Sequence, residues 1–541
     1  LACVVYEMLA GEPPYTGRTA HAVLAKQLTG PAPSVRRLRP TVAAAMERAL
    51  TKALSVTPAD RFPSPDAFVE ALMAPDTSTD RRSVAVLPFV NLSADPENEY
   101  FADGITEDVI AHLSKVRTLD VISRTSVMPY KKRERSLREI GAELGVGTLL
   151  EGSVRRAGNR VRIVAQLLDA ESDQHLWAET YDRELTDIFA IQTDVALHIA
   201  EALRATLTRD EQTRIRKEPT HNVEAYQLYL QGRQQYLEFT DEGMVKAIGF
   251  FERAIRKDPD YALAYVALAA SHLEIGGTEG GEPGHGTPEQ HYVRARTALD
   301  RAQALDPGLG EAHCILGLLK FGWEFDWSGA EREFQAAMAL NPGNADAYGF
   351  YGRMLSAMER HDEAIAMVRK ARELDPIAYR SDLISTLIRA GRLEEASPLA
   401  QALVALDPES PRAHSTLGWL LVLQGQREEG IAELENAVAL LPSGTLFLGQ
   451  LGQGYAVVGR EQDARAVARQ LEELSRKQYV EPYHLAYVYT GLGEYDAAID
   501  RLEQAYDERS GMIHGIKGSF LFTALHGHPR FEALLGRMNL A

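Results

Sequence analysis

The chain has 541 residues, of which 45% are hydrophobic and 25% charged, which is ordinary for a globular protein of about three to four domains. No apolar stretch approaches the ~20 residues that a membrane-spanning helix needs. Residues 220–541 contain 30 basic and 45 acidic residues, so this region carries −15 of the total net charge of −18. Because nucleic-acid binding depends on Lys and Arg neutralising phosphates, this surplus excludes such a role for the C-terminal region. The two cysteines, Cys3 and Cys314, are too few for a disulfide framework or a thiolate metal site, and we expect both to be buried and reduced.

Residues 1–75 are expected to be helical, with Pro and Gly turns between the helices. Two runs stand out in this segment: Tyr6-Glu7-Met8-Leu9-Ala10-Gly11-Glu12-Pro13-Pro14-Tyr15, and Ala49 to Leu54 followed by Pro58-Ala59-Asp60-Arg61-Phe62. They resemble the end of the C-terminal lobe of eukaryotic-like Ser/Thr protein kinases. The resemblance implies that Arg61 corresponds to the arginine that pairs with the glutamate of an Ala-Pro-Glu motif.

The groups that transfer phosphate in such a kinase are not found in this chain. A glycine-rich loop, a strand lysine, a catalytic aspartate and an Asp-Phe-Gly motif would all precede Leu1, together with the ATP and Mg²⁺ that they bind. Since Leu1 falls inside an apolar helical pattern, we expect a further portion upstream. For the chain itself we expect no catalytic residue, no cofactor and no metal. Without the Ala-Pro-Glu partner, Arg61 loses an ion pair whose breakage costs about 3–5 kcal/mol when buried. We therefore expect residues 1–73 to fold poorly alone and to expose apolar surface.

After a short polar linker at residues 76–82, the hydrophobic period changes over residues 83–208. Buried or alternating runs predict strands at 83–89, 119–123, 148–155, 160–168 and 175–181, and 3.6-residue periodicity predicts helices at 103–116, 137–144 and 187–207. Ala157-Gly158-Asn159 is a good hairpin turn between two of these strands. The order β-α-β-α-β-β-β-α indicates an α/β domain of about 125 residues.

Four segments of this domain carry a resemblance: 86–89, 100–107, 150–155 and 176–183. They are similar to the N-terminal domain of the periplasmic protein TolB, in a form found in bacteria between a signalling domain and helical repeats. The signalling partners in that arrangement include Ser/Thr kinases, class III adenylate cyclases and winged-helix regulators. The resemblance assigns no chemistry to the domain.

Two charged groups in this domain have alternative interpretations. Asp103, Glu107 and Asp108 are either a carboxylate cluster or, as we favour, acidic residues that stabilise a helix start. Four arginines flank the hairpin: Arg155, Arg156, Arg160 and Arg162. They either hold an anion or, as we favour, are exposed on neighbouring strands and keep the sheet soluble.

The C-terminal region has an internal repeat. Helix-ending prolines recur at 259, 307, 342, 376, 408 and 442, with steps of 48, 35, 34, 32 and 34 residues. Twelve, eight and five residues before a proline stand small, large and small residues on one helix face, as in Ala330, Phe334 and Ala337. The preceding helices carry glycines, such as Gly352, where a neighbouring helix approaches. About eight such units fit between residues 223 and 510, and residues 511–541 are expected to cap the last apolar face.

This pattern closely resembles the tetratricopeptide repeat family, which implies an all-α solenoid that binds proteins or peptides in a concave groove lined by the first helices. Tyr226, Tyr229, Tyr265, Tyr348 and Tyr351 lie on such helices, where inter-helix packing is the commoner role and ligand contact the alternative. The 48-residue step contains the glycine-rich insertion 276–286, which lacks the lysine of a phosphate-binding loop, so we expect a surface loop.

The sequence thus predicts a cytoplasmic signalling scaffold of three parts: a kinase C-lobe remnant, an α/β domain and a repeat solenoid. The linker at 76–82 has no room for a membrane span, so the first and last parts are expected on the same side of any membrane. The favoured hypothesis is the docking half of a Ser/Thr protein kinase, with protein or peptide partners. Two alternatives stay open: the α/β domain senses a small molecule and relays its state to the repeats, or the whole is a kinase-derived relic acting only as an interaction protein.

Overall fold

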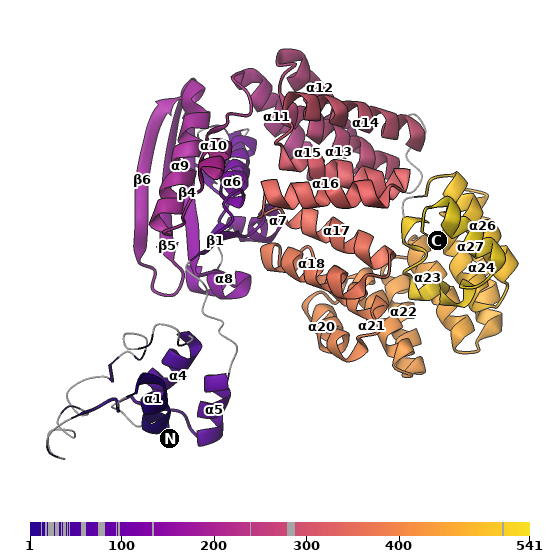
Figure 1. Ribbon diagram of the computed structural model, residues 1–541. Helices are drawn as coiled ribbons and strands as arrows, with labels where there is room; N and C mark the ends of the chain where they lie inside the picture. The colour runs from indigo at the N-terminus through magenta and orange to yellow at the C-terminus, as the bar shows by residue number, and fades with distance from the viewer. Residues whose placement is uncertain are drawn as a thin grey trace.

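The computed structural model of the protein describes residues 1–11, 13–16, 19, 26, 32–33, 35, 39, 42, 44–55, 61–73, 82–93, 95, 98–132, 135–238, 240–277, 287–510 and 513–540. They form a small helical segment, an α/β domain and a long helical region in chain order (Figure 1). Residues 76–81 of the predicted linker, residues 58–60 of the kinase-like run and residues 278–286 of the glycine-rich insertion lie outside the described residues. No described helix is both long enough and apolar enough to cross a membrane.

The N-terminal segment contains the helices α1 (Ala2–Ala10), α4 (Ala44–Ala53) and α5 (Pro65–Met73). They surround a small core that includes Tyr6, Leu50 and Phe68. Leu1, Val4 and Met8 are 67%, 58% and 76% exposed, as expected for a segment with apolar surface. The same exposed side of α1 carries Cys3, so the prediction that both thiols are buried is wrong for Cys3 and right for Cys314.

The α/β domain is built on one mixed sheet. The strands are β1 (Ser83–Val86), β2 (Val90–Asn91), β3 (Asp120–Val121), β4 (Thr148–Ala157), β5 (Arg160–Asp169) and β6 (His175–Glu184), and their spatial order is β3-β1-β4-β5-β6, with the short β2 beside β4. β1 runs parallel to β3 and β4, whereas β4, β5 and β6 are antiparallel. Alternate residues of β5, such as Val161 and Ile163, are buried while Arg162 between them is exposed, so one face of the sheet carries the core.

The helices of the domain are α6 (Glu99–Ser114), α7 (Arg124–Val127), α8 (Leu137–Leu144), α9 (Ile188–Ala202) and α10 (Arg209–Arg216). α6 and α7 contact β1, α8 contacts β4, α9 contacts β5 and β6, and α10 packs on α9. The predicted order of elements is present, with β2, α7 and α10 in addition. The predicted helix at 103–116 begins four residues earlier, because Tyr100, Phe101 and Ala102 pack into the domain core and extend the apolar stripe of α6.

Eight helix pairs follow within the described part of residues 223–507, stacked in sequence order (Figure 1). The first helices of the pairs are α11 (Val223–Tyr236), α13 (Ala262–Gly277), α15 (Gly310–Leu319), α17 (Ala345–Ala357), α19 (Arg380–Arg389), α21 (Pro411–Leu423), α23 (Thr445–Val457) and α25 (Pro482–Gly491). The second helices are α12 (Asp241–Lys257), α14 (Pro288–Leu305), α16 (Trp327–Leu340), α18 (His361–Leu374), α20 (Leu393–Leu406), α22 (Arg427–Leu440), α24 (Glu461–Ser475) and α26 (Tyr495–Asp507).

The small and large residues of the repeat meet inside each pair. Ala330, Phe334 and Ala337 on α16 are fully buried, and a Cβ at Gly317 on α15 would lie 2.8 Å from the Phe334 ring. A real side chain there would force the two helices apart, since heavy atoms in a packed core do not approach so closely. Gly352 on α17 meets Val368 on α18 in the same way. The predicted role of these glycines is therefore confirmed.

The step from Pro307 to Pro342 is one residue longer than the 34-residue step that follows it, and a local feature of the structure accounts for the extra residue. The 35-residue step from Pro307 to Pro342 contains the π-helical turn η5 (Lys320–Glu324), which extends α15. A π turn accommodates one extra residue in a helix and recurs at functional positions. Here it displays Trp323, which stacks on Tyr292 with ring centroids 4.9 Å apart.

After α26 the chain forms η6 (Ile513–Gly515), η7 (Phe520–Leu525) and α27 (Pro529–Arg537). α27 lies against α26, where Arg530 contacts Asp500 at 2.6 Å and Glu503 at 2.8 Å. Near the end of α26, Tyr506 stacks on Phe325 of the third pair, with ring centroids 5.6 Å apart. The later repeats thus curve around until the eighth pair touches the third.

Candidate functional site

The first helices of neighbouring pairs contact one another and form a continuous surface, which we call the inner face. Arg353 on α17 contacts Asp382 on α19 at 2.8 Å, and Ser415 on α21 donates to Gln450 on α23. Thr445 on α23 lies 3.0 Å from the His484 ring on α25. The inner face is therefore where side chains from several repeats can act together on one bound segment.

Charged residues gather on the inner face of the second to fifth pairs. Glu274 on α13 and Asp346 and Arg353 on α17 are exposed, and Asp382 and Arg389 on α19 are half-buried. Enclosure by the surrounding helices raises the pKa of Glu274, which Arg353 lowers and Asp346 raises further. The pKa of Asp346 is also raised by enclosure, although the Tyr379 hydroxyl donates to it at 2.8 Å. These carboxyls thus lie close enough to influence one another while remaining accessible to a ligand from solvent.

The α/β domain and the chain that follows it bind along the turns of the first four repeats. The residues at the predicted helix-ending positions make these contacts: Asp258 with Thr220, Asp306 with Lys217, Gly343 after Asn341-Pro342 with Ser114, and Asp375 with Ser123 and Ser126. Lys217 Nζ lies 2.6 Å from Asp306, and the Gly343 amide donates to the Ser114 carbonyl at 2.9 Å. The Asp-Pro turns therefore have a second role beyond ending helices, because they dock the neighbouring domain.

Glu107 and Asp108 of α6 belong to this domain junction, so the preferred assignment of Asp103, Glu107 and Asp108 to a helix start is wrong. α6 begins at Glu99, which places all three residues beyond its first turn. Glu107 pairs with Arg233 on α11, and Asp108 accepts from Tyr226 on α11 and, at 2.7 Å, from Gln192 on α9. Asp103 instead pairs within the domain, with Lys131 at 2.7 Å. Burial raises the pKa of Asp108 to about 7, against the lowering effect of the Tyr226 and Gln192 hydrogen bonds.

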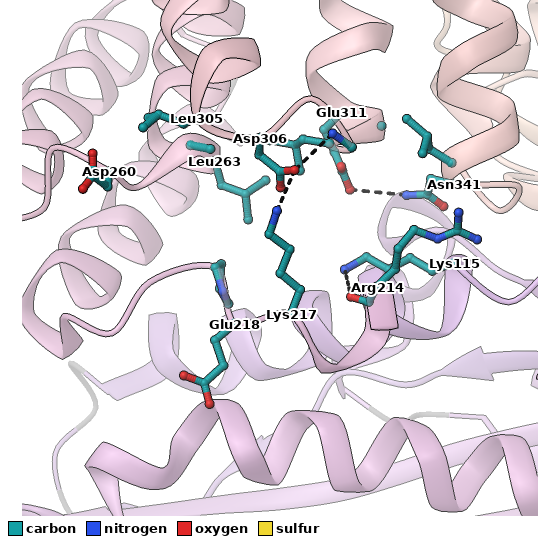
Figure 2. A pocket seen from close by; sticks show the side chains of 16 residues that line it. Lys115, Arg214, Lys217, Glu218, Asp260, Leu263, Leu305, Asp306, Glu311 and Asn341 are labelled. Carbon is teal, nitrogen blue, oxygen red and sulfur yellow. Dashed lines mark hydrogen bonds and ion pairs between the residues drawn. The ribbon is translucent and has the colours of Figure 1, made fainter. Parts of the chain in front are cut away.

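A cavity of about 160 Å³ lies between the α/β domain and the first three repeats (Figure 2). Lys115, Arg214 and Lys217 line it from one side, and Asp306, Glu311 and Asn341 from the other. Lys217 pairs with Asp306, and Asn341 donates to Glu311 at 3.3 Å. The Lys115 ammonium donates to the Arg214 carbonyl at 3.4 Å, and burial lowers its pKa. Arg214 Nε is buried without a hydrogen-bond partner among the described residues.

The other residues singled out in the sequence lie apart from these surfaces or within packing. Tyr226 and Tyr229 are buried in the core beside α9 and α12, and the Tyr351 hydroxyl donates to Glu331 at 2.5 Å. Arg155, Arg160 and Arg162 are exposed on the sheet, and Arg160 pairs with Asp182, whereas Arg156 is half-buried over the Phe101 ring. In the part of the chain that the structure describes, no group of three or more His, Cys, Asp or Glu side chains is arranged to hold a metal ion.

Comparison with known proteins identifies the repeats. The tetratricopeptide repeat family model matches residues 324–381 and 387–445, so this region consists of tetratricopeptide repeats. Among solved structures, Pseudomonas aeruginosa PilF is 19% identical, with a TM-score of 0.32, over 44% of this chain and 98% of that one. YrrB, a tetratricopeptide protein with an unusual peptide-binding site, is 23% identical, with a TM-score of 0.28, over 37% of this chain and 95% of that one.

Two curated relatives are longer signalling proteins. The putative adenylate cyclase 3 of Rhizobium meliloti is 48% identical over 187 residues, which is 35% of this chain and 32% of the cyclase. The Ser/Thr-protein kinase PknH of Mycobacterium tuberculosis is 35% identical over 80 residues, which is 14% of this chain and 13% of the kinase. The chain therefore spans about a third or less of the length of these relatives.

Proposed function

We propose that this chain is a scaffold that binds segments of other proteins on the inner face of its tetratricopeptide repeats. The observation that carries the proposal is the accessible charged surface of α13, α17 and α19, to which several repeats contribute side chains. Glu274 and Asp346 are accessible there, whereas the main acidic residue beside them, Asp382, already pairs with Arg353. A bound segment is therefore expected to place a Lys or Arg against Glu274 and Asp346.

The test is selection of displayed peptides on the purified chain, followed by affinity measurements with two charge reversals. Glu274→Lys is expected to weaken the selected peptides at least tenfold, since it replaces attraction by repulsion at the inner face. Glu252→Lys, on the exposed outer side of α12, is the matched control and should change affinity less than twofold. Equal effects of the two reversals would place the binding site elsewhere.

The finer proposal is that this scaffold is the docking half of a Ser/Thr protein kinase. The kinase-like runs of residues 6–15 and 49–62 and the similarity to PknH support it. The TolB N-terminal-like assignment of residues 83–208 rests on the four sequence segments named above and is part of this proposal. We expect the chain alone to transfer no phosphate from labelled ATP. Phosphorylation by the purified chain would refute the proposal that this chain is a docking half without catalytic activity. If the native protein contains no kinase region, the alternative of a kinase-derived relic that acts only as an interaction protein is favoured.

A second candidate function is small-molecule sensing at the cavity in Figure 2, because it lies between the α/β domain and the repeats. Lys115 and Arg214 favour a small anion, such as a carboxylate or phosphate compound. A thermal-shift screen with such compounds tests this, since a ligand that binds only the folded state raises the melting temperature. The shift should disappear in Arg214→Met and persist in Arg216→Met, an exposed arginine on the same helix. Persistence in both variants would exclude the cavity as the site.

A further inference from the structure

The inner face of the later repeats is covered by residues 513–525, which we call the C-terminal segment. It touches the first helices of four pairs in turn: Gly518 lies on α17, Phe520 on Trp419 of α21, Leu521 on Gln453 of α23 and Phe522 on Tyr487 of α25. Gln453 Nε2 donates to the Leu521 carbonyl at 2.6 Å, and the Phe522 and Tyr487 rings stack 5.0 Å apart. This path crosses the first helices of the fourth, sixth, seventh and eighth pairs, as a peptide bound along the inner face would, so the chain fills its own groove.

The fit at one position depends on glycine. A Cβ at Gly518 would overlap the carbonyl oxygen of Ser356 on α17, so the segment backbone lies directly against that helix. Close backbone contact of this kind, followed by the aromatic anchors Phe520 and Phe522, matches how extended peptides are held in grooves.

The anchors of the chain end lie outside this groove. α27 is held on α26 by Arg530, and Trp327 Nε1 of the third pair donates to the Met538 carbonyl at 2.7 Å. The Asn539 amide donates to the Phe325 carbonyl at 3.1 Å. Release of the C-terminal segment must break the bond from Lys517 Nζ to the Leu540 carbonyl at 2.7 Å and its packing against Phe531 and Leu535, whereas the contacts of Arg530, Trp327 and Asn539 can persist.

Among the described residues, the groove wall beneath the segment contains buried polar atoms that lack hydrogen-bond partners. Trp419 Nε1 on α21, Ser356 Oγ on α17 and Gln453 Oε1 on α23 are buried and have no hydrogen-bond partner in the described part of the chain. Each such atom costs about 1–3 kcal/mol relative to a partnered one. All three lie on first helices under residues 518–522, and a peptide with a different set of carbonyl and amide groups would pair with them.

We propose that the C-terminal segment is an intramolecular ligand of a second peptide site, the groove of α17, α21, α23 and α25, which opens when the segment leaves. The partner is a protein segment of the same chemistry, with aromatic and aliphatic side chains, a glycine and no acidic residue, as in residues 513–525. This inference rests on the proposed peptide-binding function and adds a site that is distinct from the charged inner face around Glu274.

The test uses the full chain and a labelled synthetic peptide with the sequence of residues 513–525. Phe520→Ala with Phe522→Ala loosens the built-in segment but leaves the groove wall intact, so the peptide is expected to bind at least tenfold more tightly than to the wild type. Adding Trp419→Ala damages the wall and should reverse that gain at least tenfold. An unchanged affinity in the loosened variant, with a melting temperature close to that of the wild type, would overturn the proposal.

Hydrogen exchange on the wild-type chain decides the question if the double variant does not fold. Release of the segment predicts that amides of residues 513–525 exchange at least tenfold faster than those of α23, through an opening smaller than global unfolding. Equal protection of the two would show that the segment is a permanent part of the core. The Glu274→Lys experiment tests the charged inner face and not this groove. If the selected peptides bind more weakly to Glu274→Lys, the proposed scaffold function stands even if the groove of the C-terminal segment never opens.

Discussion

Replacing Asp108 by Asn tests whether a carboxyl at the junction of the α/β domain and the repeats makes folding stability depend on pH. The pKa of Asp108 is raised from 3.8 to about 7, chiefly by burial and to a smaller extent by the neighbouring Glu107. The hydrogen bonds from Tyr226 and Gln192 and the charge of Lys115 act in the opposite direction. The folded protein therefore holds a proton on this carboxyl over a pH range in which the unfolded chain has lost it.

The sign of the effect follows from this difference. Below pH 4 the carboxyl is protonated in both states and contributes nothing. Between about pH 4 and 7 only the folded state keeps the proton, so stability falls as the pH rises, and above pH 7 the loss is complete. At 1.36 kcal/mol per pH unit, the gap between 3.8 and about 7 corresponds to a loss of about 4 kcal/mol.

Asn at this position stays neutral and keeps an oxygen that accepts from Tyr226 and Gln192. Asp108→Asn is therefore expected to stabilise the protein by up to about 4 kcal/mol at pH 8 and by much less at pH 5. For a cooperative unit of residues 82–541 this is about 4 °C in melting temperature. Melting curves at pH 5 and pH 8 measure the difference, with Asp194→Asn, an exposed aspartate on α9, as the control. Parallel pH dependence of the wild type and Asp108→Asn would refute the reasoning.

Three further substitutions probe the packing that the structure shows. Arg233→Met leaves Glu107, among the described residues, with a more distant ion pair to Arg124 at 3.7 Å. The substitution should lower the free energy of unfolding by about 2–3 kcal/mol in urea titrations, less than for a fully buried pair because this pair is partly exposed, and a loss below 0.5 kcal/mol would contradict this. Asp375→Ala removes three hydrogen-bond acceptor contacts and should cost about 3 kcal/mol, whereas Asp407→Ala, in a turn of the fifth repeat, should cost under 1 kcal/mol; equal losses would argue against the docked turn. Gly352→Val overpacks the contact of α17 with Val368 and is expected to destabilise by about 1–3 kcal/mol, and an unchanged melting temperature would show that the helices can separate.

The sequence predicted the structure in most detail in the repeat region, where the same local pattern recurs. The small-large-small spacing around Phe334 and the glycine at 352 predicted which helix faces meet, because both depend on residues fewer than 40 positions apart. The extra residue in the step from Pro307 to Pro342 was visible in the sequence. Its cause, a π turn at residues 320–324, was not, since a one-residue insertion can also lengthen a loop.

The junctions could not be predicted, because their partners are distant in sequence. Asp108 bonds Tyr226, which lies 118 residues away, and Asp375 bonds Ser126 across 249 residues. Asp103, Glu107 and Asp108 therefore looked like an acidic helix start, when two of them are docking residues. A signal was nevertheless present: Asp108 and Glu107 interrupt an apolar stripe in a helix whose flanking residues are buried, which is costly unless each charge finds a partner.

The α/β domain and the C-terminal segment each cover part of the repeats, and this limits where a partner can bind first. The α/β domain covers the Asp-Pro turns of the first four repeats, from Asp258 to Asp375, and the C-terminal segment covers the first helices from α17 to α25. The charged inner face around Glu274 and Asp346 lies between them and remains accessible. A partner that binds there meets α17, on which Gly518 of the C-terminal segment also lies. The charged face and the groove therefore share α17, and binding at one would affect the other only if the partner prefers the state in which the segment has left.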